Sequence, residues 1–96
     1  KIAFQYNPDE KEGTFVWEGH LNSGEIKFPL SNTQGFECDY LMPEEDGTSV
    51  TEAEKMERRN YPDSGMNDFK WKVDEACNYK ISLNVIDMTV KFEKLQ

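Results

Sequence analysis

The chain is poor in basic residues, with 11 lysines and arginines against 19 acidic residues among 96, so its net charge is −8. This shortage argues against nucleic-acid binding, because binding to phosphates needs clustered lysine and arginine. The same negative charge disfavours anionic membrane surfaces. A neutral ligand is compatible with such a chain, and sugars are the obvious neutral polar class.

Long apolar runs are absent as well. No stretch approaches the roughly 20 residues of a transmembrane helix. The opening sequence KIAFQYNPDEKEG has no apolar core of a secretory signal. The chain does not begin with Met, so we expect a trimmed or mature fragment, and its localisation cannot be read from a targeting sequence.

The sequence also lacks the residue clusters that catalytic and metal sites require. Cys38 and Cys77 form no CxxC motif, and whether they pair in a disulfide is left open. His20 is the only histidine, and no metal-ligand or nucleophile–base spacing accompanies it. The acidic run 44–46 lacks the ligand order of an EF-hand, and we interpret it as a solvated turn. We therefore expect no metal, no cofactor and no enzymatic activity.

What the sequence does contain is alternation of apolar and polar residues with a period of two. Residues 14–28 predict two strands around a turn at 22–25, a hairpin in which Leu21 and Ile26 share a face. Similar alternation occurs over residues 2–6, 36–42, 69–73, 79–85 and 88–92. About seven short strands of this kind predict an all-β antiparallel sandwich or barrel. Trp17 and Trp71 share the phase of the inward residues, so we predict both in the core.

Residues 43–68 form a long polar insertion between the fourth and fifth predicted strands. Thr51 and Glu54 fit a capping box, which predicts a short helix over about residues 52–59. A connection of this length is usually functional or disordered. We interpret it as a solvated insertion, with a functional loop as the alternative.

Three segments resemble the hallmark of SusE/SusF-type domains: FxWxGxLxxGEIKF at 15–28, DFKWKV at 68–73 and the closing MTV at 88–90. Such domains form arrays in surface lipoproteins of Bacteroides-like bacteria that gather starch or other glycans. The resemblance covers about residues 14–92 and implies an immunoglobulin-like antiparallel β-sandwich. It implies a single domain over residues 1–96, the C-terminal domain of a longer protein, without the family's first strand.

The resemblance also implies a function. It indicates non-catalytic binding of starch or another polysaccharide at the bacterial cell surface, as part of a glycan-uptake system. The domain would be held at the outer membrane by a lipid anchor outside this sequence, with other outer-membrane glycan-uptake proteins as partners. The alternative is a structural spacer or protein-interaction domain of the same kind of lipoprotein, without its own ligand site.

Candidate sugar-binding residues are the aromatic residues outside the clean strands. A concave aromatic site in a sandwich forms where loops meet strand edges. The segment after the predicted hairpin and the polar insertion both meet this condition. We predict Phe36 or Tyr40 as the stacking ring and Tyr61 as a second wall. Lys27, which the family resemblance places beside the usual stacking position, is the predicted donor to sugar hydroxyls.

Overall fold

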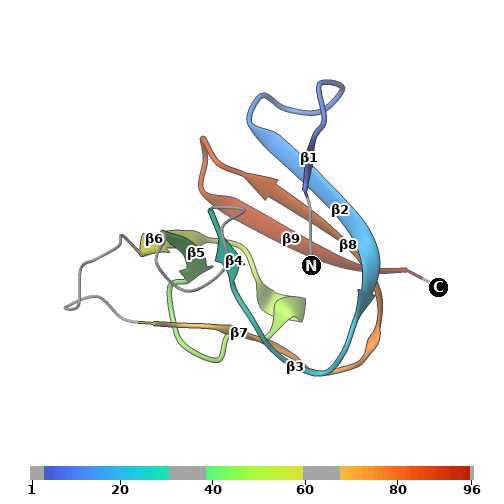
Figure 1. Cartoon of the computed structure of the whole chain (residues 1–96), viewed down its shortest axis with the longest axis vertical. Coiled ribbons are helices and arrows are strands. Elements are labelled where there is room, and N and C mark those ends of the chain that lie inside the picture. Colours follow the sequence, from blue (N-terminus) through green and yellow to red (C-terminus); the bar gives the residue numbers. More distant parts are fainter. Residues whose placement is uncertain (1–3, 31–38, 60–67, 96) are drawn as a thin grey trace.

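The computed structural model describes residues 4–30, 39–59 and 68–95, and the regular secondary structure of these residues consists of strands and one 3₁₀ turn (Figure 1). In chain order they are β1 (Gln5–Tyr6), β2 (Thr14–Leu21), β3 (Gly24–Ile26), β4 (Phe28–Pro29), β5 (Tyr40–Pro43), β6 (Met56–Arg59), β7 (Trp71–Val73), β8 (Cys77–Asn84) and β9 (Thr89–Leu95). One 3₁₀ turn, η1 (Val50–Glu52), precedes β6. All pairs between these strands are antiparallel, so the predicted all-β class is confirmed.

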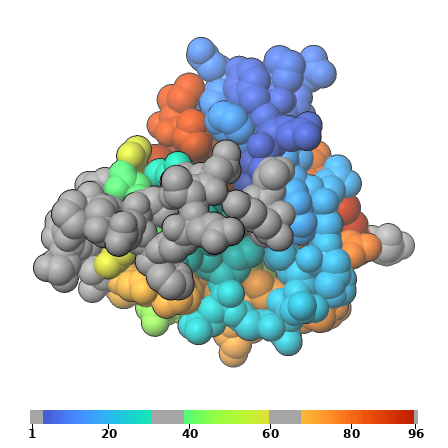
Figure 2. Space-filling view, in the orientation of Figure 1, coloured from blue at the N-terminus to red at the C-terminus, as the bar shows by residue number. Residues whose placement is uncertain are grey.

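The strands form three sheets in a sandwich-like arrangement. A four-stranded sheet has the order β1-β2-β8-β9, while β3-β7 and β4-β5-β6 form two smaller sheets. Figure 1 shows the four-stranded sheet on one side of the molecule and the two smaller sheets opposite it. The end that carries β1 and its connection to β2, dark blue in Figure 2, projects beyond the rest.

The predicted hairpin over residues 14–28 is wrong. β2 pairs along its whole length with β8, from Thr14 opposite Asn84 to Leu21 opposite Cys77. β3 pairs with β7 instead, so the chain leaves the four-stranded sheet after β2 and enters the opposite layer. Gly24 lies at this crossing with φ +140°, a conformation that glycine adopts without strain. Leu21 is buried and Ile26 packs against the same core, so the alternation identified the buried face but not the partner strand.

The predicted helix over residues 52–59 is also wrong. The 3₁₀ turn ends at Glu52, and its N-cap is Ser49, whose hydroxyl accepts a hydrogen bond from the backbone N–H of Thr51. Residues 56–59 of the segment form β6, which pairs with β5 and buries Met56. Strand pairing and burial therefore override the helix preference of this charged segment, as tertiary context commonly does.

The core lies between the two layers and is centred on Trp71, whose exposed fraction is 0%. Its ring lies 5.2 Å from that of Phe28 and 5.9 Å from that of Phe92, measured between centroids. The core position of Trp71 is thus confirmed, whereas Trp17 packs against the core but stays half-buried. Val85, the last residue of the alternation predicted over residues 79–85, is exposed because β8 ends one residue before it.

The ring of Trp17 lies directly over Gly19, two residues along the same strand face. A Cβ at Gly19 would collide with the Trp17 ring. Only glycine, which has no Cβ, therefore fits at position 19 beneath the Trp17 ring. The ring in turn covers the backbone of β2 at this point.

Candidate ligand-binding site

The outer face of the four-stranded sheet, which points away from the core, carries closely spaced polar groups. In the register of its strands, Ser82 lies opposite Lys91 and Asn84 lies opposite Thr89. Directly opposed residues of an antiparallel pair share one face of the sheet, with their Cβ atoms about 4.5–5.5 Å apart. Hydroxyl, amide and ammonium groups therefore stand side by side on this face.

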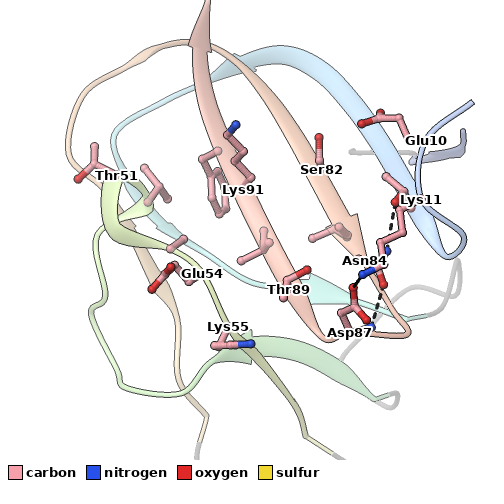
Figure 3. Close-up of a pocket in the computed structure, with 16 residues that line it drawn as sticks. Glu10, Lys11, Thr51, Glu54, Lys55, Ser82, Asn84, Asp87, Thr89 and Lys91 are labelled. Atoms are coloured by element: carbon pink, nitrogen blue, oxygen red, sulfur yellow. Dashed lines mark hydrogen bonds and ion pairs between the residues drawn. The ribbon is translucent and has the colours of Figure 1, made fainter.

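A groove of about 610 Å³ lies over the β8–β9 part of the outer face (Figure 3). Apolar residues contribute to its lining, but we call it the polar groove after the charged, hydroxyl and amide side chains that line it. Figure 3 shows residues 10–11, from the β1–β2 connection, on one side of β8 and β9 and residues 51–55 on the other. The charged residues that line the groove are Glu10, Lys11, Glu54, Lys55, Asp87 and Lys91. Its two walls come from segments that lie far apart in the chain.

One wall is fixed by backbone hydrogen bonds to the start of β9. The Val90 N–H donates to the carbonyl of Glu54 at 2.9 Å, and the Met56 N–H donates to the carbonyl of Met88 at 2.9 Å. Lys55, between these two bonds, lies opposite Thr89. The segment 54–56 therefore lies against β9 like one more short strand, and this pairing fixes the backbone from which the charged side chains of this wall extend.

The other wall is fixed by the buried side chain of Asn84. Its amide nitrogen donates to the carbonyl of Glu12 at 3.1 Å and to the hydroxyl of Thr14 at 3.2 Å. Its amide oxygen accepts hydrogen bonds from the backbone N–H groups of residues 86 and 87. Asn84 thus joins the β1–β2 connection to the β8–β9 turn. An ion pair of 2.5 Å between Lys11 and Asp87 spans the same junction.

The charges of the groove balance, since its lining residues supply three carboxylates and three ammonium groups. This balance contrasts with the net charge of −8 of the whole chain. Among the described residues, the side chains of Glu54 and Lys55 have no hydrogen bond or ion pair, and Lys91 approaches only Glu93, at 3.9 Å. The groove therefore offers both donors and acceptors to a ligand without selecting for either sign of charge.

Of the residues predicted for a sugar site, the structure brings Lys27 and Tyr40 together. The ammonium of Lys27 lies 3.9 Å from the centroid of the Tyr40 ring, which is a cation–π contact. The same ammonium lies 2.5 Å from the carboxylate of Asp68. This hydrogen bond, against the smaller opposing effect of burial, lowers the pKa of Asp68 below its ordinary value.

This arrangement corrects the expected role of Tyr40 as an exposed stacking ring. Tyr40 is only 4% exposed, and the side chain of Lys27 is 13% exposed. A sugar could stack on this ring face only if Lys27 left both Tyr40 and Asp68. Phe36 and Tyr61 lie outside the described residues, so their predicted roles stay predictions.

The lining residues of the polar groove were missed at the sequence level. Ser82 and Lys91 occupy outward positions of alternating strands, which are most simply interpreted as solvated. Alternation does reveal that they point outward, but the walls at residues 10–11 and 54–55 come together only through tertiary pairing. No motif in the sequence joins these segments.

Other candidate chemistry is sparse in the parts of the chain that the structure describes. Among those residues, no group of three or more His, Cys, Asp or Glu side chains is placed to hold a metal ion. The exposed His20 lies with its Nδ1 atom 3.2 Å from the amide oxygen of Asn78, and Cys77 is a free thiol. Over the same ranges, no helix has the length and apolar character needed to cross a bilayer.

Comparison with known proteins gives no significant match to a family model, a curated protein or a solved structure.

Proposed function

We propose that the chain is a non-catalytic carbohydrate-binding domain that takes a neutral polysaccharide, starch or another glycan, into the polar groove. The observation that carries this proposal is the balance of three carboxylates and three ammonium groups along a groove of a strongly acidic chain. Sugar hydroxyls both donate and accept hydrogen bonds, so they suit a surface that presents both kinds of partner. A polyanion or a polycation would instead meet three like charges.

The setting that we propose is the cell surface of a Bacteroides-like bacterium. A lipoprotein of SusE/SusF type would hold the domain at the outer membrane, beside other proteins of glycan uptake. The support is the sequence resemblance over about residues 14–92, together with the antiparallel, sandwich-like fold. The immunoglobulin-like identity of the sandwich belongs to this same proposal.

Affinity electrophoresis in native gels that contain starch, xylan, mannan or β-glucan tests the proposal. We expect retardation in at least one gel and weaker retardation for Lys91→Ala, since a lost hydrogen bond from a charged group costs about 1–3 kcal/mol. Lys80→Ala is the matched control. Lys80 lies on the same outer face, opposite Glu18 and Glu93, but does not line the groove. Both variants lose one positive charge, so their mobilities without polysaccharide should agree.

A structural spacer or protein-interaction domain is the second candidate. The observation that favours it is the Lys27 ammonium, which lies over the Tyr40 ring and pairs with Asp68, so that this face of the ring is already occupied. The two candidates differ in the same gels. Absence of retardation with every polysaccharide would overturn the carbohydrate proposal and favour the spacer.

A further inference from the structure

A second hollow, of about 390 Å³, lies at the other side of the same sheet, over β1 and β2. Gln5, Asn7, Val16 and Glu18 line it, together with Tyr6 and Trp17, which have the opposite phase. Gln5 lies opposite Val16, so both share one face of the sheet. Residues two apart on a strand also share a face, so Asn7 follows Gln5, and Glu18 follows Val16, on the outward phase. We call this feature the β1–β2 hollow.

The β1–β2 hollow and the polar groove adjoin. Val16, which lines the hollow, lies directly opposite Ser82, which lines the groove. Gln5 lies opposite Val16 on one side of this pair, and Lys91 lies opposite Ser82 on the other. One outward residue from each strand thus forms a continuous row, Gln5–Val16–Ser82–Lys91, perpendicular to the strands.

The composition of this row suits a sugar chain. The Gln5 amide and the Ser82 hydroxyl can each donate and accept, the Lys91 ammonium donates, and Val16 offers an apolar contact for the C–H groups of a sugar ring. With three strand spacings of about 4.8 Å, the row spans about 14 Å from β1 to β9. A hexopyranose unit advances a glycan chain by close to one such spacing, so the row has room for about three consecutive units.

We infer that the ligand is an extended, linear polysaccharide that crosses the strands along this row and is bound through several consecutive sugar units. This inference rests on the proposed carbohydrate function and specifies its ligand. A mono- or disaccharide would fill only the polar groove or only the β1–β2 hollow. Affinity should therefore depend on chain length up to the span of the row and no further.

Isothermal titration calorimetry with maltose, maltotetraose and maltohexaose, and with the xylan-, mannan- and cellulose-derived series, tests the inference. For the series of the polysaccharide that retards the protein, we expect affinity to rise about tenfold or more from the disaccharide to the tetrasaccharide. The hexasaccharide should add little. Gln5→Ala should weaken tetrasaccharide binding several-fold and leave disaccharide binding in the groove unchanged. Asn78→Ala, which removes an exposed amide of the same face outside both hollows, should change neither.

The failure of this inference is distinguishable from that of the proposed function. Equal affinities for the disaccharide and the hexasaccharide would overturn the crossing chain while leaving carbohydrate binding intact. So would wild-type tetrasaccharide affinity in a folded Gln5→Ala variant. Failure to bind every polysaccharide in the gels would overturn the proposed function, and the inference with it.

Discussion

Replacement of Trp71 by alanine tests the packing of the whole sandwich at one position. Trp71 is fully buried on β7, and its ring contacts the rings of Phe28 and Phe92. The substitution empties the centre of the core, with aromatic neighbours on both sides that cannot easily collapse into the space. We therefore expect a loss of stability without a specific effect on the outer face.

The magnitude follows from the burial. Truncation of a buried tryptophan to alanine costs about 3–5 kcal/mol. A domain of this size has a total stability of about 5–15 kcal/mol. Since 1 kcal/mol corresponds to roughly 4–8 °C for a small domain, the melting temperature should fall by at least about 12 °C.

A second variant at the same position, Trp71→Phe, refines the expectation. The indole nitrogen of Trp71 is buried and has no hydrogen-bond partner among the residues that the structure describes. A buried donor without a partner costs about 1–3 kcal/mol, so phenylalanine keeps aromatic packing while it removes this penalty. Trp71→Phe should therefore destabilise the chain clearly less than Trp71→Ala.

Urea unfolding followed by far-ultraviolet circular dichroism measures all three proteins on one scale. An unchanged midpoint for Trp71→Ala would refute the placement of Trp71 in the core. Equal losses in the alanine and phenylalanine variants would refute the argument from the unpaired indole nitrogen.

Two further predictions concern polar contacts. Asn84→Ala should cost about 1–3 kcal/mol in urea unfolding, because it removes a buried, fully hydrogen-bonded amide, whereas the exposed Asn78→Ala should cost no more than about 0.5 kcal/mol. Equal losses would contradict this role of Asn84. The lowered pKa of Asp68 means that its contact with Lys27 stabilises the folded state above the ordinary carboxyl value of 3.8 and is lost as pH falls through the folded pKa. Asp68→Asn should therefore be slightly less stable than wild type at neutral pH and equal to it well below 3.8. A difference that persists in acid would contradict the assignment.

The inward residues of the later strands could be predicted from the sequence. Trp71, Val73, Tyr79, Ile81 and Val90 are all buried, as their alternation indicates. Alternation succeeds here because it depends only on which side of one strand faces the core. That property is local, because the residues of a single strand determine which of its faces is apolar.

The pairing of strands could not be predicted in the same way. Alternation over residues 14–28 is compatible with a hairpin and equally compatible with two strands in opposite layers, since Leu21 and Ile26 face one core in either case. The segment 56–59 carries good helix formers and a capping pattern upstream, but its pairing with β5 decides its structure. Both outcomes are set by contacts between remote residues.

The polar groove was beyond sequence reasoning for the same physical reason. Its floor is set by the register of two strands, with Ser82 beside Lys91 and Asn84 beside Thr89, and this register exists only once β8 and β9 have paired. The exposure of Tyr40 was mispredicted for a different reason. Sequence identified a lysine and a tyrosine that do meet, but it could not show that their contact closes the ring face.

The crossing from β2 to the opposite layer has a consequence for how the chain folds. The long partner of β2 is β8, so the contacts from Thr14 to Asn84 enclose most of the chain in one loop. Closure of such a loop costs entropy before any pairing compensates it, and all-β domains dominated by remote contacts fold in about milliseconds to seconds. During synthesis, β2 emerges long before β8 and presents an unpaired edge until β8 has left the ribosome. A truncated chain that ends before Cys77 would therefore lack β8 and β9, and β2 would have lost its long partner.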